Sequence, residues 1–269
     1  EINATQTNYK FRCFNVDLRV MFTSPLLLTD FDIFPRPVSY ITYKVRANDN
    51  KRHNVKIYFG AATDLAVNKP TQEVAAELYS TKTLSILRAG TTEQPILKKK
   101  GDDLRIDWGY MHVAVPKSAN AAQYITRGKD VGNPFLASAR STAPIALTDT
   151  IKGKELFLNT VLSFPNVSRS FSQQYIEIGY DDLFPVEFFG IKLKPWWKAD
   201  GTKTIEKELN MAAADYNSVM KKCEQFNRTM YQDALKAGGD KYAKLCVLAY
   251  RQSIAAHALV KSPHGEILF

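Results

Sequence analysis

The chain has 269 residues, of which 45% are hydrophobic and 23% are charged, with 13 glycines and 12 prolines. This composition excludes disordered and fibrous proteins, and because no apolar run approaches ~20 residues we expect no membrane span. The net charge is +9, but basic residues are scattered among acids and the run Lys98 to Lys100 lacks aromatic residues for base stacking, so we expect no nucleic-acid partner.

Residues 11–180 are organised in short segments in which apolar and polar residues alternate. This period of two is typical of strands with one buried face. Strands are predicted at residues 16–22, 41–45, 55–59, 104–110, 156–162 and 174–180. Because no long helical pattern is interleaved, the sequence favours an antiparallel, mostly β sandwich over a βαβ sheet.

Two connections within this region carry their own predictions. Residues 48–51 read Asn-Asp-Asn-Lys, a turn signal that predicts a hairpin joining the strands at 41–45 and 55–59. Residues 119–143 follow neither period and are expected to be irregular or partly helical.

After Tyr180 the pattern changes, and residues 181–203 mix proline, aromatic and charged residues. So many aromatic side chains are not expected to remain in water, so this segment is predicted to be an ordered linker. The chain therefore divides into a β-sandwich domain (1–180), the linker (181–203) and the first helices of an incomplete helical domain (204–269). The fold class is α+β multidomain.

The C-terminal part carries the pattern of a helical hairpin. An apolar stripe begins at Ile205 and recurs every three or four residues as far as Met230. Thr202 or Thr204 can cap its start. The pair Gly238-Gly239 ends the first helix, and a second helix is predicted over residues 241–260.

The second helix is apolar almost all round, so it is expected to be buried on several sides. Each large apolar side chain contributes ~1.5–3 kcal/mol on burial, and one hairpin cannot supply that cover. Further helices are the simplest source, and we expect the chain to be a fragment or a cleaved product. The three cysteines form no metal spacing, and Cys223 and Cys246 are expected to be buried thiols.

Several stretches resemble the glutaminase A-like family. In the β region they are RPVSY (36–40), HNVKIYF (53–59), AVN (66–68) and KGDDLRIDWGY (100–110). In the C-terminal region they are GYDDL (179–183), EFFG (187–190), PWW (195–197), GGDKY (238–242) and AYRQSIAAH (249–257). The resemblance implies an N-terminal β-sandwich that braces a catalytic toroid of helical hairpins.

The same resemblance implies a secreted or periplasmic hydrolase that converts glutamine to glutamate and ammonia. Its partners would be the remainder of the helical domain and a small-molecule amide or carbohydrate substrate. Two alternatives stay open: a glycoside-active toroid enzyme, and a non-catalytic β-sandwich that binds a carbohydrate or a protein partner. The 269-residue chain alone is expected to be inactive.

No nucleophile elbow, zinc, P-loop or dinucleotide motif is present, so no cofactor or metal is expected and the catalytic residues stay unknown. Asp181, Asp182 and Glu187 are the densest carboxylates at a domain junction, where they can bind an ammonium or calcium ion, or form a capped turn. Trp196 and Trp197 can form an aromatic platform or pack between domains.

Two polar residues lie on the apolar second helix, where each needs a partner or a cavity. Arg251 can pair with an acid or face a substrate carboxylate. His257 can be a hydrogen-bonded core residue or a catalyst. Both are substrate-binding candidates, together with the five junction residues.

Overall fold

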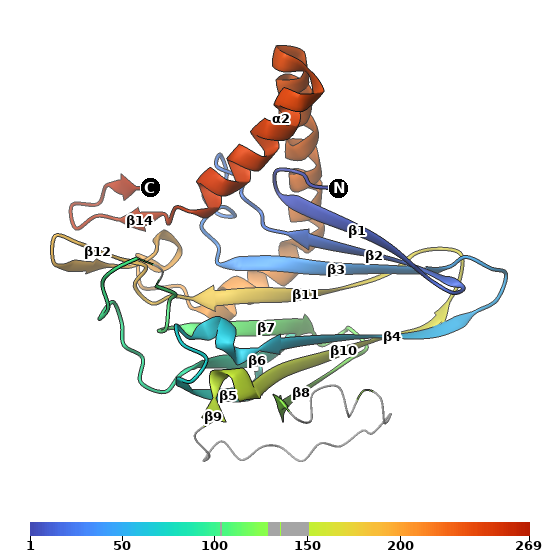
Figure 1. Ribbon diagram of the computed structural model, residues 1–269, viewed down its shortest axis with the longest axis horizontal. Helices are drawn as coiled ribbons and strands as arrows, with labels where there is room; N and C mark the ends of the chain where they lie inside the picture. Colours follow the sequence, from blue (N-terminus) through green and yellow to red (C-terminus); the bar gives the residue numbers. More distant parts are fainter. Residues whose placement is uncertain (103, 129–134, 136–150) are drawn as a thin grey trace.

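The computed structural model describes residues 1–102, 104–128, 135 and 151–269. Two antiparallel sheets face each other, and a long helical segment follows them, which confirms the predicted β-sandwich ahead of a helical region (Figure 1). The larger sheet has eight strands in the order β1-β2-β3-β11-β7-β6-β5-β9, and the smaller has three in the order β4-β10-β8.

The strands of the larger sheet are β1 (Gln6–Cys13), β2 (Val16–Thr23), β3 (Val38–Ala47), β11 (Ser172–Asp181), β7 (Tyr110–Pro116), β6 (Leu84–Thr91), β5 (Glu73–Ser80) and β9 (Ile151–Lys152). Those of the smaller sheet are β4 (His53–Ala62), β10 (Leu156–Val167) and β8 (Ala121–Arg127). Two short ladders join β12 (Val186–Phe188) to β13 (Ile191–Leu193) and β14 (Val260–Lys261) to β15 (Ile267–Leu268). The helical segments are η1 (Thr63–Ala66), η3 (Gly153–Glu155), η4 (Trp196–Lys198) and α2 (Ile205–Ala255).

The core of the sandwich lies between the two sheets. The inward side chains of the alternating segments meet there, among them Val45, Val113 and Ile176 from the larger sheet and Leu158 and Leu162 from the smaller. All five are fully buried. The period of two that predicted strands therefore also places the core.

The predicted hairpin between residues 41–45 and 55–59 is wrong. Strand β3 pairs with β2 on one side and β11 on the other. Both of its edges are therefore occupied, and β4 instead pairs with β10 in the smaller sheet. The turn at residues 48–51 crosses from one sheet to the other.

Two other predictions for the β region need correction. Residues 104–109 are not a strand, because Gly109 has a φ of 78° that interrupts extended backbone, and β7 begins only at Tyr110. Residues 121–127 are a strand and not an irregular segment, because β8 pairs along the edge of β10. Apart from Phe135, the remainder of the 119–143 prediction beyond residue 128 lies outside the described residues.

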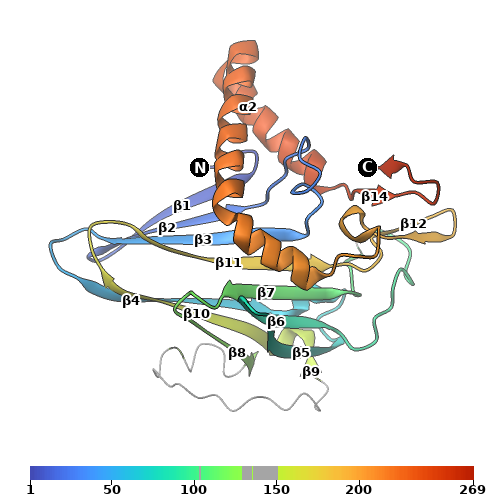
Figure 2. The ribbon, with the colours of Figure 1, turned by 180° about the vertical axis from the view of Figure 1, so that it is seen from behind.

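Helix α2 folds back on itself at Gly239, whose φ of 77° and ψ of −176° are not helical (Figure 2). It therefore forms the predicted hairpin. The Thr204 hydroxyl caps its start by accepting a hydrogen bond from the Lys207 amide at 3.4 Å. The predicted end at Val260 is wrong: the helix ends at Ala255, because Val260 pairs with Leu268 in the ladder β14–β15.

The first helix of this hairpin packs on the outer face of the larger sheet. Its predicted stripe is confirmed, with Leu209, Ala212 and Val219 fully buried against a second core that includes Tyr40 and Ile86. This core fixes the helix to the sheet over about its first five turns.

The hairpin projects from the sheet into solvent, and its second helix runs from the bend back toward β14 and the N-terminal segment (Figures 1 and 2). Only Ala243 and Val247 of this helix are buried, whereas Tyr242, Leu245 and Leu248 are exposed. The cover expected for this helix is not supplied by the described part of the chain. None of the helices described has the length and hydrophobicity needed to span a membrane.

Candidate functional site at the junction of the sheet and helix α2

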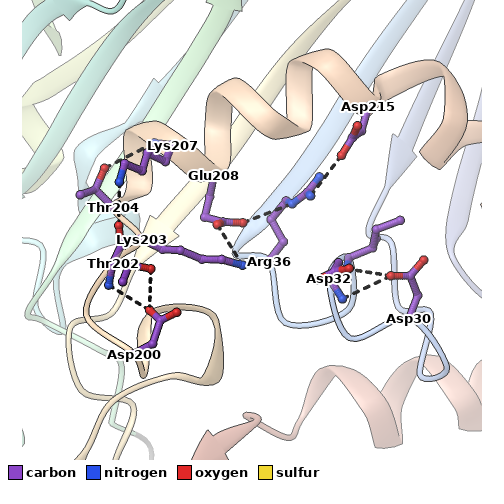
Figure 3. Close-up of polar contacts among 11 residues, drawn as sticks. Asp30, Asp32, Arg36, Asp200, Thr202, Lys203, Thr204, Lys207, Glu208 and Asp215 are labelled. Atoms are coloured by element: carbon purple, nitrogen blue, oxygen red, sulfur yellow. Dashed lines mark hydrogen bonds and ion pairs between the residues drawn. The ribbon is translucent and has the colours of Figure 1, made fainter.

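A buried ion pair joins the loop before β3 to the first turns of α2. Arg36 lies between two prolines at the end of a turn, and its backbone amide donates to the Ile33 oxygen at 3.1 Å. Its Nε lies 3.3 Å from Glu208 Oε2, and its Nη2 lies 3.2 Å from Asp215 Oδ2 (Figure 3). The side chains of Arg36 and Glu208 are only 3% and 1% exposed. Charge attraction in a low-dielectric setting therefore locks the helix to the loop.

The ion pair has a second cation on its solvent side. Lys203 Nζ lies 3.6 Å from Glu208 Oε1, so the carboxylate sits between two positive groups (Figure 3). The contact from Arg36 Nε meets the distance of an ion pair without the alignment of a hydrogen bond. Its contribution is therefore mainly electrostatic.

Two titratable groups on the sheet lie buried beneath the helix. Neither carboxyl oxygen of Glu177 has a hydrogen-bond partner among the described residues, and burial raises its pKa well above the ordinary value despite the opposing charge of Arg36. Burial also lowers the pKa of His112 to about 4. Both shifts favour the uncharged forms of Glu177 and His112.

The structure brings together three of the residues predicted at the junction, Asp181, Asp182 and Trp197. Asp181, at the end of β11, forms an ion pair with Lys198 of η4, and its Oδ1 accepts a hydrogen bond from the Leu183 amide at 3.0 Å. The Lys198 ammonium lies 4.9 Å from the ring of Trp197, which is buried in the second core. Asp182 is adjacent to this pair.

Trp196 and Trp197 do not form one platform. Trp197 is buried, whereas Trp196 is half-buried with its ring 6.4 Å from that of Phe31. A third indole completes the junction: Trp108 Nε1 donates to the backbone oxygen of Asp182 at 2.8 Å. The interdomain packing alternative is the one that matches this placement.

Asp182 gives the junction a pH dependence. Burial raises its pKa from 3.8 to about 6, against the opposing charge of Lys198. Because the pKa of Asp182 is higher in the folded state than in the unfolded state, the folded state binds the proton more tightly. The stability gained from this protonation is fully present below about pH 4 and is lost as the pH rises through about 6.

We predict that Asp182→Asn raises the free energy of unfolding at about pH 7.5 and changes it little at about pH 4, measured by urea unfolding. Glu187→Gln, at an exposed acid, is the control.

The other predicted site residues lie elsewhere. Glu187 is exposed on β12, opposite Lys192 of β13. Arg251 Nη1 donates to the backbone oxygen of Asn3 at 2.8 Å, so it binds the N-terminal segment. His257 is exposed beyond the end of α2 and contacts the backbone of Ser253.

Sequence reasoning missed the Arg36 cluster. The local signal for Arg36 was a single arginine between two prolines, and Glu208 read as a favourable charge in a first helical turn. Only the docking of α2 brings residues 172 positions apart into contact. In the described part of the chain, no three His, Cys, Asp or Glu side chains are grouped to hold a metal ion.

A cleft of about 910 Å³ lies between the N-terminal segment and the two helices of α2. Its walls carry amide and charged side chains, including Gln6, Asn227, Arg228 and Lys244, beside the apolar Leu248. Asn227 is held in place: its Nδ2 donates to Gln6 Oε1 at 3.1 Å. The cleft has the volume and the mixed lining of a small-ligand site.

Residues 5–233 match the family described as "Domain of unknown function (DUF5127)". The chain belongs to the DUF5127 family. No curated protein matches the sequence. The matched region covers the whole sandwich and the first helix of α2, and it ends before the bend at Gly239.

Three solved structures similar to this DUF5127 domain have 6–8% sequence identity to it. A chain described as a kojibiose phosphorylase from the human microbiome has 8% identity and a TM-score of 0.37, with 84% of this chain and 23% of that chain covered. Heparan sulfate lyase HepC from Pedobacter heparinus has 6% identity and a TM-score of 0.27, with 66% and 24% covered. A chain described as an aldose 1-epimerase from Escherichia coli K12 has 6% identity and a TM-score of 0.28, with 65% and 64% covered.

The resemblance to the glutaminase A-like family is therefore wrong. The family that matches is the one described as DUF5127, over residues 5–233. The prediction of a glutaminase-like hydrolase rested on that resemblance and is wrong as well. The chain spans about a quarter of the phosphorylase and of the lyase, and less than two thirds of the epimerase.

Proposed function

We propose that this DUF5127 domain is a non-catalytic brace that orients a helical hairpin for a further helical domain. The observation that carries the proposal is the contrast between the two halves of α2. The first half is fixed to the sheet by the second core and the Arg36–Glu208 pair. The second half runs back from the bend and carries an apolar face that the described residues leave open.

The composition of that open face supports a helical partner. Tyr242, Leu245 and Leu248 are spaced three apart, as on one face of an α-helix. Each contributes ~1.5–3 kcal/mol when it is buried, so covering the face is strongly favourable. The DUF5127 match also ends at Asp233, which supports assigning the second helix to the next structural unit.

The brace is tested by substituting Leu245, which is 62% exposed in this chain. Leu245→Lys is expected to change the stability of the 269-residue chain by no more than ~0.5 kcal/mol. In the full-length protein the same change is expected to cost about 2 kcal/mol, because a charge replaces a buried side chain. The measurement is urea unfolding of both proteins.

Leu65, in η1, is the matched control. It is 64% exposed, so Leu65→Lys is expected to be neutral in the chain and in the full-length protein alike. Equal effects of Leu245→Lys in the two proteins would count against the brace.

A second candidate function, carbohydrate binding, is favoured by the cleft beside α2. Amide and charged side chains beside an apolar wall suit a ligand with many hydroxyl groups and apolar ring faces. We propose accordingly that the protein carrying this domain is glycoside-active. Turnover of a glycoside panel by the full-length protein, with none by the 269-residue chain, is the expected result.

A further inference from the structure

Three cations lie side by side on the outer face of the larger sheet. Lys10 of β1 is directly opposite Arg19 of β2, and Arg19 is directly opposite Lys44 of β3. Opposed residues on neighbouring strands have Cβ atoms ~4.5–5.5 Å apart, so like charges in such a row repel each other. Among the described residues, none of the three forms an ion pair with a carboxylate.

In the next row of the same three strands, the positive charges are neutralised by a carboxylate. There the residue between two arginines is an acid: Asp17 lies 3.5 Å from Arg12 and 2.9 Å from Arg46. Two residues further along β2, the equivalent position is Arg19. The row of Lys10, Arg19 and Lys44 therefore lacks the anion that its neighbour contains.

Arg19 is held in a defined place. Its guanidinium carbon lies 4.5 Å from the centre of the Phe171 ring, and that of Arg46 lies 4.8 Å from the same ring. Cation–π contacts of this kind orient the guanidinium group without neutralising it. They also occupy the Phe171 ring, which is then not free to stack a nucleobase.

The row lines a hollow that adjoins the cleft beside α2. This hollow has a volume of about 320 Å³ and contains Lys10, Arg19 and Lys44 on the sheet side. Four residues line both the hollow and the cleft: Glu1, Asn3, Gln6 and Glu224. A ligand in the cleft can therefore reach the three cations.

We propose that Lys10, Arg19 and Lys44 bind the carboxylate or sulfate group of an acidic saccharide that lies in the cleft. The proposal deepens the carbohydrate-binding function proposed above and rests on it. An oxyanion accepts several charge-assisted hydrogen bonds and relieves the repulsion in the row. Glu224 on the helix side accepts hydrogen bonds from hydroxyl groups and repels further negative charge, so it favours a singly charged sugar over a polyanion.

The test titrates the full-length protein with three probes at constant ionic strength: inorganic sulfate, a trisaccharide with one galacturonate residue and two neutral hexoses, and neutral maltotriose. Arg19→Gln is expected to weaken binding of the acidic trisaccharide about tenfold, because one charge-assisted hydrogen bond is lost. Arg12→Gln changes the net charge equally but removes a cation from the neutralised row. We expect it to alter binding less than about twofold.

A second readout is stability without ligand. Arg19→Gln is expected to raise the midpoint of thermal unfolding, because it removes cross-strand repulsion, and to abolish the further rise caused by sulfate. If the two substitutions act equally, or sulfate and the acidic trisaccharide both fail to bind, the anion site is overturned.

The three probes distinguish failure of the anion site from failure of carbohydrate binding. If maltotriose binds as well as the acidic trisaccharide and Arg19→Gln has no effect, carbohydrate binding stands and the anion site is overturned. If sulfate binds through Arg19 but no saccharide binds, the anion site stands with a free oxyanion as its ligand, and the carbohydrate function fails.

Discussion

Replacing Arg36 with methionine is expected to destabilise the domain by about 3–5 kcal/mol. The substitution keeps an apolar stem of similar length but leaves the Glu208 carboxylate, which is 1% exposed, without its buried partner. Lys203 remains near Glu208 at 3.6 Å, but its side chain is itself partly exposed to solvent and screens the charge less effectively. The cost is mainly that of an uncompensated buried charge.

Urea unfolding of the 269-residue chain measures this loss, and two variants interpret it. Arg46→Met removes a more exposed ion pair with Asp17 and should cost no more than ~1 kcal/mol. The double variant Arg36→Met with Glu208→Leu removes both buried charges and should recover most of the stability. Failure of the double variant to recover would show that Arg36 acts through packing and not through charge.

Leu209→Ala is expected to cost about 2–5 kcal/mol. The Leu209 side chain is fully buried between α2 and the larger sheet, and it fits where Gly179 of β11 has no side chain. A Cβ on Gly179 would lie 3.3 Å from Leu209 Cδ2. Because the neighbouring residue is a glycine in a paired strand, little can move to fill the cavity left by alanine.

Met211→Ala, two residues further along the same helix, is the matched control for Leu209→Ala. Its side chain is 41% exposed, so the substitution should cost no more than ~0.5 kcal/mol. Thermal and urea unfolding of both variants give the comparison. A small loss for Leu209→Ala would mean that the helix docks on the sheet less firmly than the second core implies.

The strands and the helical hairpin were predictable because their signals are local. Alternation along β2, β10 and β11 and the stripe from Ile205 record which face of each element is buried. The partner of each strand was not predictable in the same way. The turn at residues 48–51 reads as a hairpin, and only the pairing of β3 on both edges sends β4 to the other sheet.

The candidate sites depend on contacts between distant positions. Lys10, Arg19 and Lys44 look scattered in the sequence, yet strand register sets them in one row. Arg36 meets Glu208 only because α2 docks beside β3. Conversely, the predicted candidates Glu187, Arg251 and His257 share no site, because their contacts lie on three different segments: Lys192, Asn3 and Ser253.

The bend at Gly239 lies far from the junction that holds α2. From Ile205 to the bend the first helix is about 50 Å long, at about 1.5 Å per residue. A change of about 5° in the angle between this helix and the sheet would therefore displace the bend by about 4 Å. The buried pair of Arg36 and Glu208 lies at the first turn of the helix, where it docks on the sheet. A small change in that one contact would be magnified at Tyr242 and Leu245, the surface on which the next helices would align.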